Sequence, residues 1–174
     1  MRTAAVTVVL ALCFACGWLL GGGPSHEARA QGKGKGGGGG GSGGAQCSID
    51  SVTPVALGNY DPESATAATS TGQLRFSCKG NQTLTVQVTI GPSAVSGSIA
   101  DRAMRELGGG DQLHYNLFQD QRGTIIWGDG VNGGSPAFVT GSKNFSVEIY
   151  GIAHPAQQVS QGIYADVLRI TILP

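Results

Sequence analysis

The sequence predicts an all-β fold, an incomplete immunoglobulin-like antiparallel β-sandwich that lacks its final strand. Short segments of alternating apolar and polar residues follow one another, and clusters of Gly, Pro, Asn and Asp separate them. No segment favours a helix beyond one possible turn at residues 101–107. The last segment, residues 164–174, has the pattern of a core strand and is followed by no turn and no closing strand. We therefore expect an unpaired sheet edge there, which another polypeptide completes.

Residues 1–30 are expected to be a signal peptide that is removed on export. Arg2 supplies a positive charge, residues 4–20 form an apolar run, and a break rich in Gly and Pro precedes the small residues Ala28 and Ala30. A membrane anchor is the alternative, because the apolar run approaches the length that crosses a bilayer. The break and the small-residue site favour a signal peptide, with cleavage after Ala30 and no transmembrane anchor in the mature chain.

Residues 31–46 are expected to be a flexible linker. Ten of these sixteen residues are Gly, and none is Val, Ile, Leu, Met or aromatic, so the segment has no side chain to contribute to a core. Residues 47–174 follow, and these 128 residues are enough for one sandwich core. The mature chain would carry nine Lys and Arg against ten acidic residues, with no basic stripe that would favour nucleic acid.

The cysteines predict one disulfide. Cys13 and Cys16 would leave with the signal peptide, so Cys47 and Cys78 are the pair that remains in an exported chain. Two free buried thiols are the alternative, which an oxidising compartment disfavours. A bond between Cys47 and Cys78 would join the first strand to the second and stabilise the domain by roughly 3–4 kcal/mol in the chain-entropy model.

Alternation of apolar and polar side chains places the strands along the domain. We expect strands at residues 74–78, 84–90, 112–118, 144–150 and 164–173. The inward faces of the first four would carry Leu74, Phe76, Cys78, Leu84, Val86, Val88, Ile90, Leu113, Tyr115, Leu117, Phe145, Val147 and Ile149. The inward face of the last strand would carry Tyr164, Leu168, Ile170 and Ile172. We predict that these four residues belong to the groove that accepts the missing strand.

Residues with catalytic or metal-binding potential are few. His114 and His154 have no third partner close in sequence, so a solvated or core role is favoured over metal ligation. The chain has neither a GxSxG motif nor a carboxylate pair with the spacing for acid–base catalysis. The loop at residues 127–134 offers acidic and amide oxygens to calcium but lacks the full ligand pattern, so a turn with a packed Trp127 is favoured. We expect no enzyme, no cofactor and no metal.

The order of several short motifs resembles the spore coat U family of secreted proteins, which includes subunits of archaic chaperone-usher pili. These motifs are Cys47-Ser-Ile, Leu57-Gly-Asn-Tyr60, Gly72-Gln-Leu-Arg-Phe-Ser-Cys78, Arg102-Ala-Met104, Leu113-His-Tyr-Asn-Leu-Phe118, Trp127-Gly-Asp-Gly130, Ile149-Tyr-Gly151 and Gly162-Ile-Tyr-Ala-Asp166. The resemblance implies an immunoglobulin-like fold without its final strand. It also implies a periplasmic chaperone that fills the groove temporarily, an outer-membrane usher, and a neighbouring pilin or coat subunit that supplies a donor strand.

One departure from the family pattern affects the expected role. A typical pilin of this family has an alternating apolar segment before its first cysteine, whereas this chain has the glycine-rich residues 31–46. It is therefore expected to accept a strand but not to donate one. Three outcomes follow: a subunit at the terminating end of a fibre, a coat protein outside a fibre, or a domain that completes itself in an unusual way.

The function expected from these observations is structural. The chain would be a secreted, non-catalytic subunit of a pilus or coat that passes through the periplasm to the cell surface or the medium. The alternative is a self-contained β-sandwich that binds a carbohydrate or another surface ligand through its Gly, Asn and Asp loops. That alternative requires exposed aromatic side chains, and only Trp127 and Phe138 are near those loops in sequence.

Overall fold

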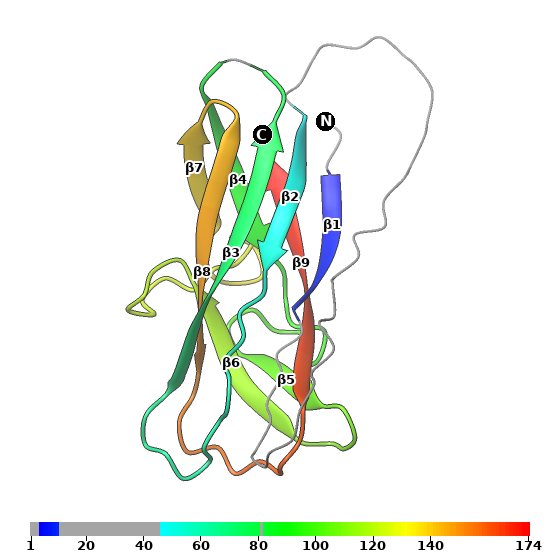
Figure 1. Cartoon of the computed structure of the whole chain (residues 1–174), viewed down its shortest axis with the longest axis vertical. Helices are drawn as coiled ribbons and strands as arrows, with labels where there is room; N and C mark the ends of the chain where they lie inside the picture. Colours follow the sequence, from blue (N-terminus) through cyan, green and yellow to red (C-terminus); the bar gives the residue numbers. More distant parts are fainter. Residues whose placement is uncertain (1–3, 11–45, 81) are drawn as a thin grey trace, which may run out of the picture.

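The computed structural model describes residues 4–10, 46–80 and 82–174, which form β-strands and no helix (Figure 1). The strands are β1 (Ala4–Leu10), β2 (Cys47–Thr53), β3 (Ala68–Cys78), β4 (Leu84–Ile90), β5 (Arg102–Glu106), β6 (Gln112–Phe118), β7 (Ala137–Gly141), β8 (Asn144–Ala153) and β9 (Tyr164–Leu173). Among these residues there is no helix with the length and apolar character that a membrane crossing requires. The predicted linker, apart from Gln46, lies outside the described residues, as does most of the predicted signal peptide.

All strand pairs in the sheet are antiparallel, and the strand order is β2-β3-β8-β6-β5-β9-β4-β7, with β1 paired to β9 beside this path. In Figure 1, β3 and β8 run side by side along the front of the molecule and β4 lies behind them. Leu74 on β3 and Val88 on β4 nevertheless belong to one buried cluster. The sheet is therefore folded around a single apolar core, and the predicted all-β antiparallel fold is confirmed.

The core is built from the alternating positions that the sequence predicts. Phe76 on β3 is the register partner of Phe145 on β8, and their rings stack with centroids 4.7 Å apart. Of the predicted inward residues, only Leu84 and Val147 are half-buried and the others are buried. Since each buried Val, Leu, Ile or Phe contributes roughly 1.5–3 kcal/mol, this shared core is the main source of stability.

The possible helical turn at residues 101–107 is wrong, because this segment contains strand β5. Three consecutive residues of β5, Arg102, Ala103 and Met104, are fully buried. The strand pairs with β6 over four residues and with the first two residues of β9. A strand buried on both faces has no alternation, so periodicity did not reveal it.

Two glycines allow the chain that follows β2 to pack closely against β3 and β8. A Cβ atom at Gly72 would lie 2.7 Å from the carbonyl oxygen of Thr53 and 3.0 Å from the backbone nitrogen of Val55. A Cβ atom at Gly151 would lie 2.3 Å from Cγ1 of Val55. Val55 is fully buried, and the absence of a side chain at these two glycines leaves the space in which it packs.

We expect Gly72→Ala to lower the free energy of unfolding by about 1–3 kcal/mol, because the added methyl group overlaps backbone atoms that cannot rotate away. Urea unfolding followed by circular dichroism would measure this change. Gly110→Ala is the matched control, since no heavy atom lies within 4 Å of a Cβ built there. Equal stability of the two variants would contradict this account of the close approach.

Candidate functional site

The last strand, β9, is paired along both of its edges. Residues Ile170–Ile172 pair with β4 on one edge and with β1 on the other, so β4 and β1 flank β9 from opposite sides. The β1 pairing is antiparallel and runs through seven Cα partners, from Ala4 opposite Ile172 to Leu10 opposite Asp166. We call this side of β9, from Asp166 to Ile172, the acceptor edge.

In the full chain this edge of β9 is paired, whereas the expectation of an unpaired edge concerns the chain from residue 31 onward and stays a prediction. Residues 4–10 cover the acceptor edge, although they lie within the predicted signal peptide. Their composition, Ala-Ala-Val-Thr-Val-Val-Leu, is rich in β-branched residues that favour a strand. An apolar strand beside β9 satisfies backbone groups that an open edge would leave to water.

The predicted inward residues of β9 all face the core. Tyr164, Leu168, Ile170 and Ile172 are at most 3 % exposed and belong to the main apolar cluster. Arg169, between them, is exposed. The backbone pairing with β1 covers the acceptor edge beside these residues.

Asp166 occupies an inward position of β9 that the sequence analysis did not single out. It is 2 % exposed. Its Oδ2 accepts a hydrogen bond from the Tyr115 hydroxyl at 2.8 Å, and its Oδ1 accepts from the backbone nitrogens of Ala94 at 3.1 Å and Val167 at 2.8 Å. Burial, followed by the charge of Asp166, raises the pKa of Tyr115 well above its ordinary value. The signal was present in the sequence, since Asp166 has the same period-two phase as Tyr164 and Leu168.

The Cys47–Cys78 disulfide is present and joins the first residue of β2 to the last residue of β3. The two cysteines are also direct register partners in the β2–β3 pair. The bond therefore joins the first strand of the domain to the second, as the sequence predicts, and closes a segment of 31 residues.

A comparison with protein-family models gives a match to the Spore Coat Protein U domain over residues 43–171. The chain belongs to the spore coat protein U domain family. The resemblance inferred from the motifs is confirmed, and the matched range includes β2 to β8 and most of β9. A search among curated proteins finds no matching sequence.

The spore coat U family is associated with secreted pilin-like and coat subunits. Together with the Cys47–Cys78 disulfide, this membership indicates an extracytoplasmic protein.

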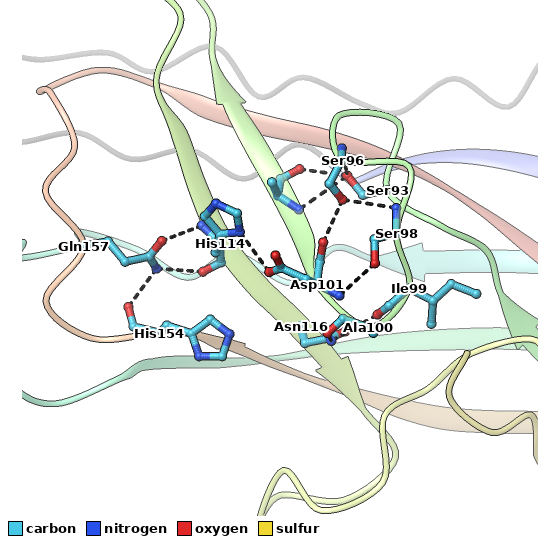
Figure 2. Close-up of polar contacts among 11 residues, drawn as sticks. Ser93, Ser96, Ser98, Ile99, Ala100, Asp101, His114, Asn116, His154 and Gln157 are labelled. Atoms are coloured by element: carbon cyan, nitrogen blue, oxygen red, sulfur yellow. Dashed lines mark hydrogen bonds and ion pairs between the residues drawn. The ribbon is translucent and has the colours of Figure 1, made fainter. Parts of the chain in front are cut away.

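The two histidines of the spore coat U domain take part in a surface network of polar contacts (Figure 2). Nδ1 of His114 lies 2.8 Å from Oδ1 of Asp101. The Gln157 side chain donates to the carbonyl oxygens of His114 and His154 at 2.8 and 2.9 Å. Within residues 46–80 and 82–174, no three His, Cys, Asp or Glu residues are grouped to hold a metal ion. The Gln157 side chain and the His154 backbone, whose nitrogen donates to the His114 carbonyl at 3.3 Å, therefore tie β6 to the chain that follows β8.

The loop after Trp127 is a turn with a packed indole, as the sequence predicts. Trp127 is fully buried, and its indole nitrogen donates to the Val88 carbonyl at 3.0 Å. Asp129 accepts from the backbone nitrogens of Val131 and Asn132 at 2.9 and 2.7 Å. The Asn132 side chain also donates to Asp129, and this bond contributes most to lowering the pKa of the Asp129 carboxyl. In this spore coat U domain the carboxylate thus organises the loop.

Proposed function

We propose that this protein is a secreted, non-catalytic structural subunit of a surface fibre or coat, and that it accepts a donor strand at the acceptor edge of β9. One observation carries the proposal: the strand that covers this edge, β1, comes from the segment that signal-peptide cleavage after Ala30 would remove. The mature chain would then need another strand in the same place. Membership of the spore coat U family supports the same role.

Removal of β1 would leave β9 with unpaired backbone groups from Asp166 to Ile172. It would also open the core beside Leu168, Ile170 and Ile172, which are now buried. In this interpretation the mature domain is an incomplete immunoglobulin-like sandwich, and β1 occupies the position of the missing final strand. A partner strand with alternating apolar residues would restore both the pairing and the burial.

The expected partners follow from the need to keep the acceptor edge of β9 covered during export. A periplasmic chaperone would fill it temporarily, an outer-membrane usher would export the subunit, and a neighbouring pilin or coat subunit would supply the permanent strand. The route would be Sec-dependent export to the periplasm and then the cell surface or the medium. N-terminal sequencing of the exported protein tests the first step, because the proposal requires Gln31 as the first residue.

Carbohydrate binding, the alternative role, requires exposed aromatic side chains, and one of the two candidates is buried. Trp127 is fully buried and so is not available to stack on a sugar, while Phe138 on β7 is 65 % exposed. A single exposed aromatic side chain beside these loops gives weak support for a sugar site, so we favour the strand-acceptor role.

We expect a fluorescent peptide with the sequence of residues 4–10 to bind the exported protein, and a peptide with the sequence of residues 31–46 not to bind. The first offers alternating Val and Leu side chains, each contributing roughly 1.5–3 kcal/mol when buried. The second is mostly glycine, which contributes no apolar side chain and loses more backbone entropy. Anisotropy titrations measure both. Tight binding of the glycine-rich peptide, or none by the apolar one, would contradict an acceptor-only role.

A further inference from the structure

Strand β7 is an edge strand with no charge, proline or bulge that would keep another chain from pairing with it. It is the last strand in the order β9-β4-β7, and among the described residues it pairs with β4 alone. Figure 1 shows β7 at the margin of the molecule. Natural edge strands are commonly protected by charges, proline or bulges, whereas Ala137-Phe-Val-Thr-Gly141 has none of these and keeps a regular register with β4.

The strand at the other end of this order, β2, is protected. Its register with β3 shifts between Ile49 and Ser51, so Asp50 lies at an irregularity of the strand. The Asp50 carboxylate accepts a hydrogen bond from the Ser77 hydroxyl at 2.8 Å. Two β2 strands that paired antiparallel about their middle residue would place Asp50 opposite Asp50, and like charges in that position are destabilising. Of the two strands, β7 is therefore the one suited to pair with a second copy.

The side chains of β7 match those of an identical strand. A two-fold axis at Val139 would place Val139 opposite its copy, Phe138 opposite Thr140, and Ala137 opposite Gly141. No like charges meet in this arrangement. Phe138 is 65 % exposed and Val139 is half-buried, so both have apolar surface left to cover. The two Phe138 residues become diagonal neighbours about 7–8 Å apart, a separation that aromatic side chains can span.

We propose that β7 is a self-association surface, and that it pairs antiparallel with β7 of a second copy about a two-fold axis at Val139. The sheet of each copy then continues into the other. The acceptor edge of β9 lies on the far side of β4 from β7, so the pairing leaves that edge accessible in both copies. This lateral contact goes beyond the strand-acceptor function and does not depend on it.

The length of β7 determines the expected strength of the contact. Five residues of strand extend about 17 Å, so the contact buries less than the roughly 1,200 Å² at the lower limit of stable complexes. We therefore expect a weak dimer that forms as the protein concentration rises. Copies held close together on a surface would pair more fully, because their effective concentration is higher.

The test uses the full chain, in which β1 covers the acceptor edge. Sedimentation velocity from about 5 to 500 μM should show a monomer–dimer equilibrium. Val139→Lys and Val139→Glu should each weaken the dimer at least about tenfold, because like charges would then lie opposite one another. An equimolar mixture of the two variants should restore dimerisation to within about threefold of the unmodified chain, since opposite charges would meet.

Val52→Lys is the matched control. Val52 is also half-buried, packs against the same apolar core and lies on β2. Its replacement by Lys has a similar effect on the core but should leave the dimer unchanged. Melting temperatures of the variants would show that each one is folded.

Cysteine crosslinking tests the register independently of charge. Val139→Cys would face its own copy at about 4.5–5.5 Å between Cα atoms, within the range of a disulfide. Thr140→Cys would lie diagonally from its copy at about 7–8 Å, at or beyond the limit of that range. Mild oxidation should therefore give at least about fivefold more covalent dimer with Val139→Cys than with Thr140→Cys.

Each result supports or overturns the inference. A full chain that stays monomeric at the highest concentration overturns the self-association surface. A dimer that survives Val139→Lys shows that another surface forms it. Charged variants that do not recover when mixed, or equal crosslinking at residues 139 and 140, overturn the two-fold axis at Val139. If the charged variants do not fold, the crosslinking ratio decides.

Discussion

Removal of residues 1–30 is expected to make the domain self-associate and to lower its melting temperature by roughly 15 °C or more relative to the full chain. β1 covers seven residues of β9, and four of its residues are Cα partners of the inward positions Asp166, Leu168, Ile170 and Ile172. Losing this strand would leave a row of β9 backbone groups unpaired, in a domain whose total stability is typically only about 5–15 kcal/mol. Calorimetry and light scattering would measure both effects.

A donor strand fused after Pro174 is expected to reverse the loss. The sequence of residues 4–10, joined through a short turn, would return antiparallel to β9 and restore a monomer with a melting temperature near that of the full chain. The matched control carries Gly at the first, third, fifth and seventh donor positions, which correspond to Ala4, Val6, Val8 and Leu10. A stable monomer of residues 31–174 without any donor would refute the acceptor role.

Replacement of Arg102 is expected to have the second large effect. Arg102→Met should lower the free energy of unfolding by more than about 3 kcal/mol, because several buried acceptors lose their donor together. The guanidinium donates to Asn116 Oδ1 at 2.6 Å and to the carbonyls of Ile90, Gly91 and Trp127 at 3.1, 2.9 and 2.8 Å. Burial lowers the pKa of Arg102 to about 10, so the group still carries its charge at neutral pH.

Urea unfolding of the full chain would measure this loss, with Arg105→Met as the matched control. Arg105 is on the same strand, β5, but its side chain is exposed, so its replacement should change stability by less than about 0.5 kcal/mol. Similar midpoints for the two variants would show that the buried guanidinium does not hold β4, β6 and the Trp127 loop together.

The strands that the sequence predicted well are those whose apolar residues alternate with polar ones. Residues 84–90 and 164–173 alternate along almost their whole length, and the structure has strands with these bounds, β4 and β9. The cysteine pair was also predictable, because export leaves few possible partners. The local sequence pattern is enough to predict a strand where the burial of each residue depends only on its position along that strand.

The remaining features depend on contacts between residues far apart in the sequence. β5 was missed because it contains a charged residue, Arg102, that is buried. Its burial is possible because its guanidinium donates hydrogen bonds to acceptors on β4 and at residues 116 and 127. β7 is only five residues long. β1 lies in an apolar run whose composition suits a signal peptide, and only the register with β9 shows that it can also act as a strand.

The disulfide determines how the domain would respond to a pulling force. Tension from residues 31–46 would enter the domain next to Cys47, the first residue of β2. Without a covalent link, such a force would break the β2–β3 hydrogen bonds one after another from that end. The bond from Cys47 to Cys78 instead passes the load directly to the end of β3, which is paired with β8 over ten residues. A force that enters at Cys47 would therefore not separate β2 from β3 one hydrogen bond at a time.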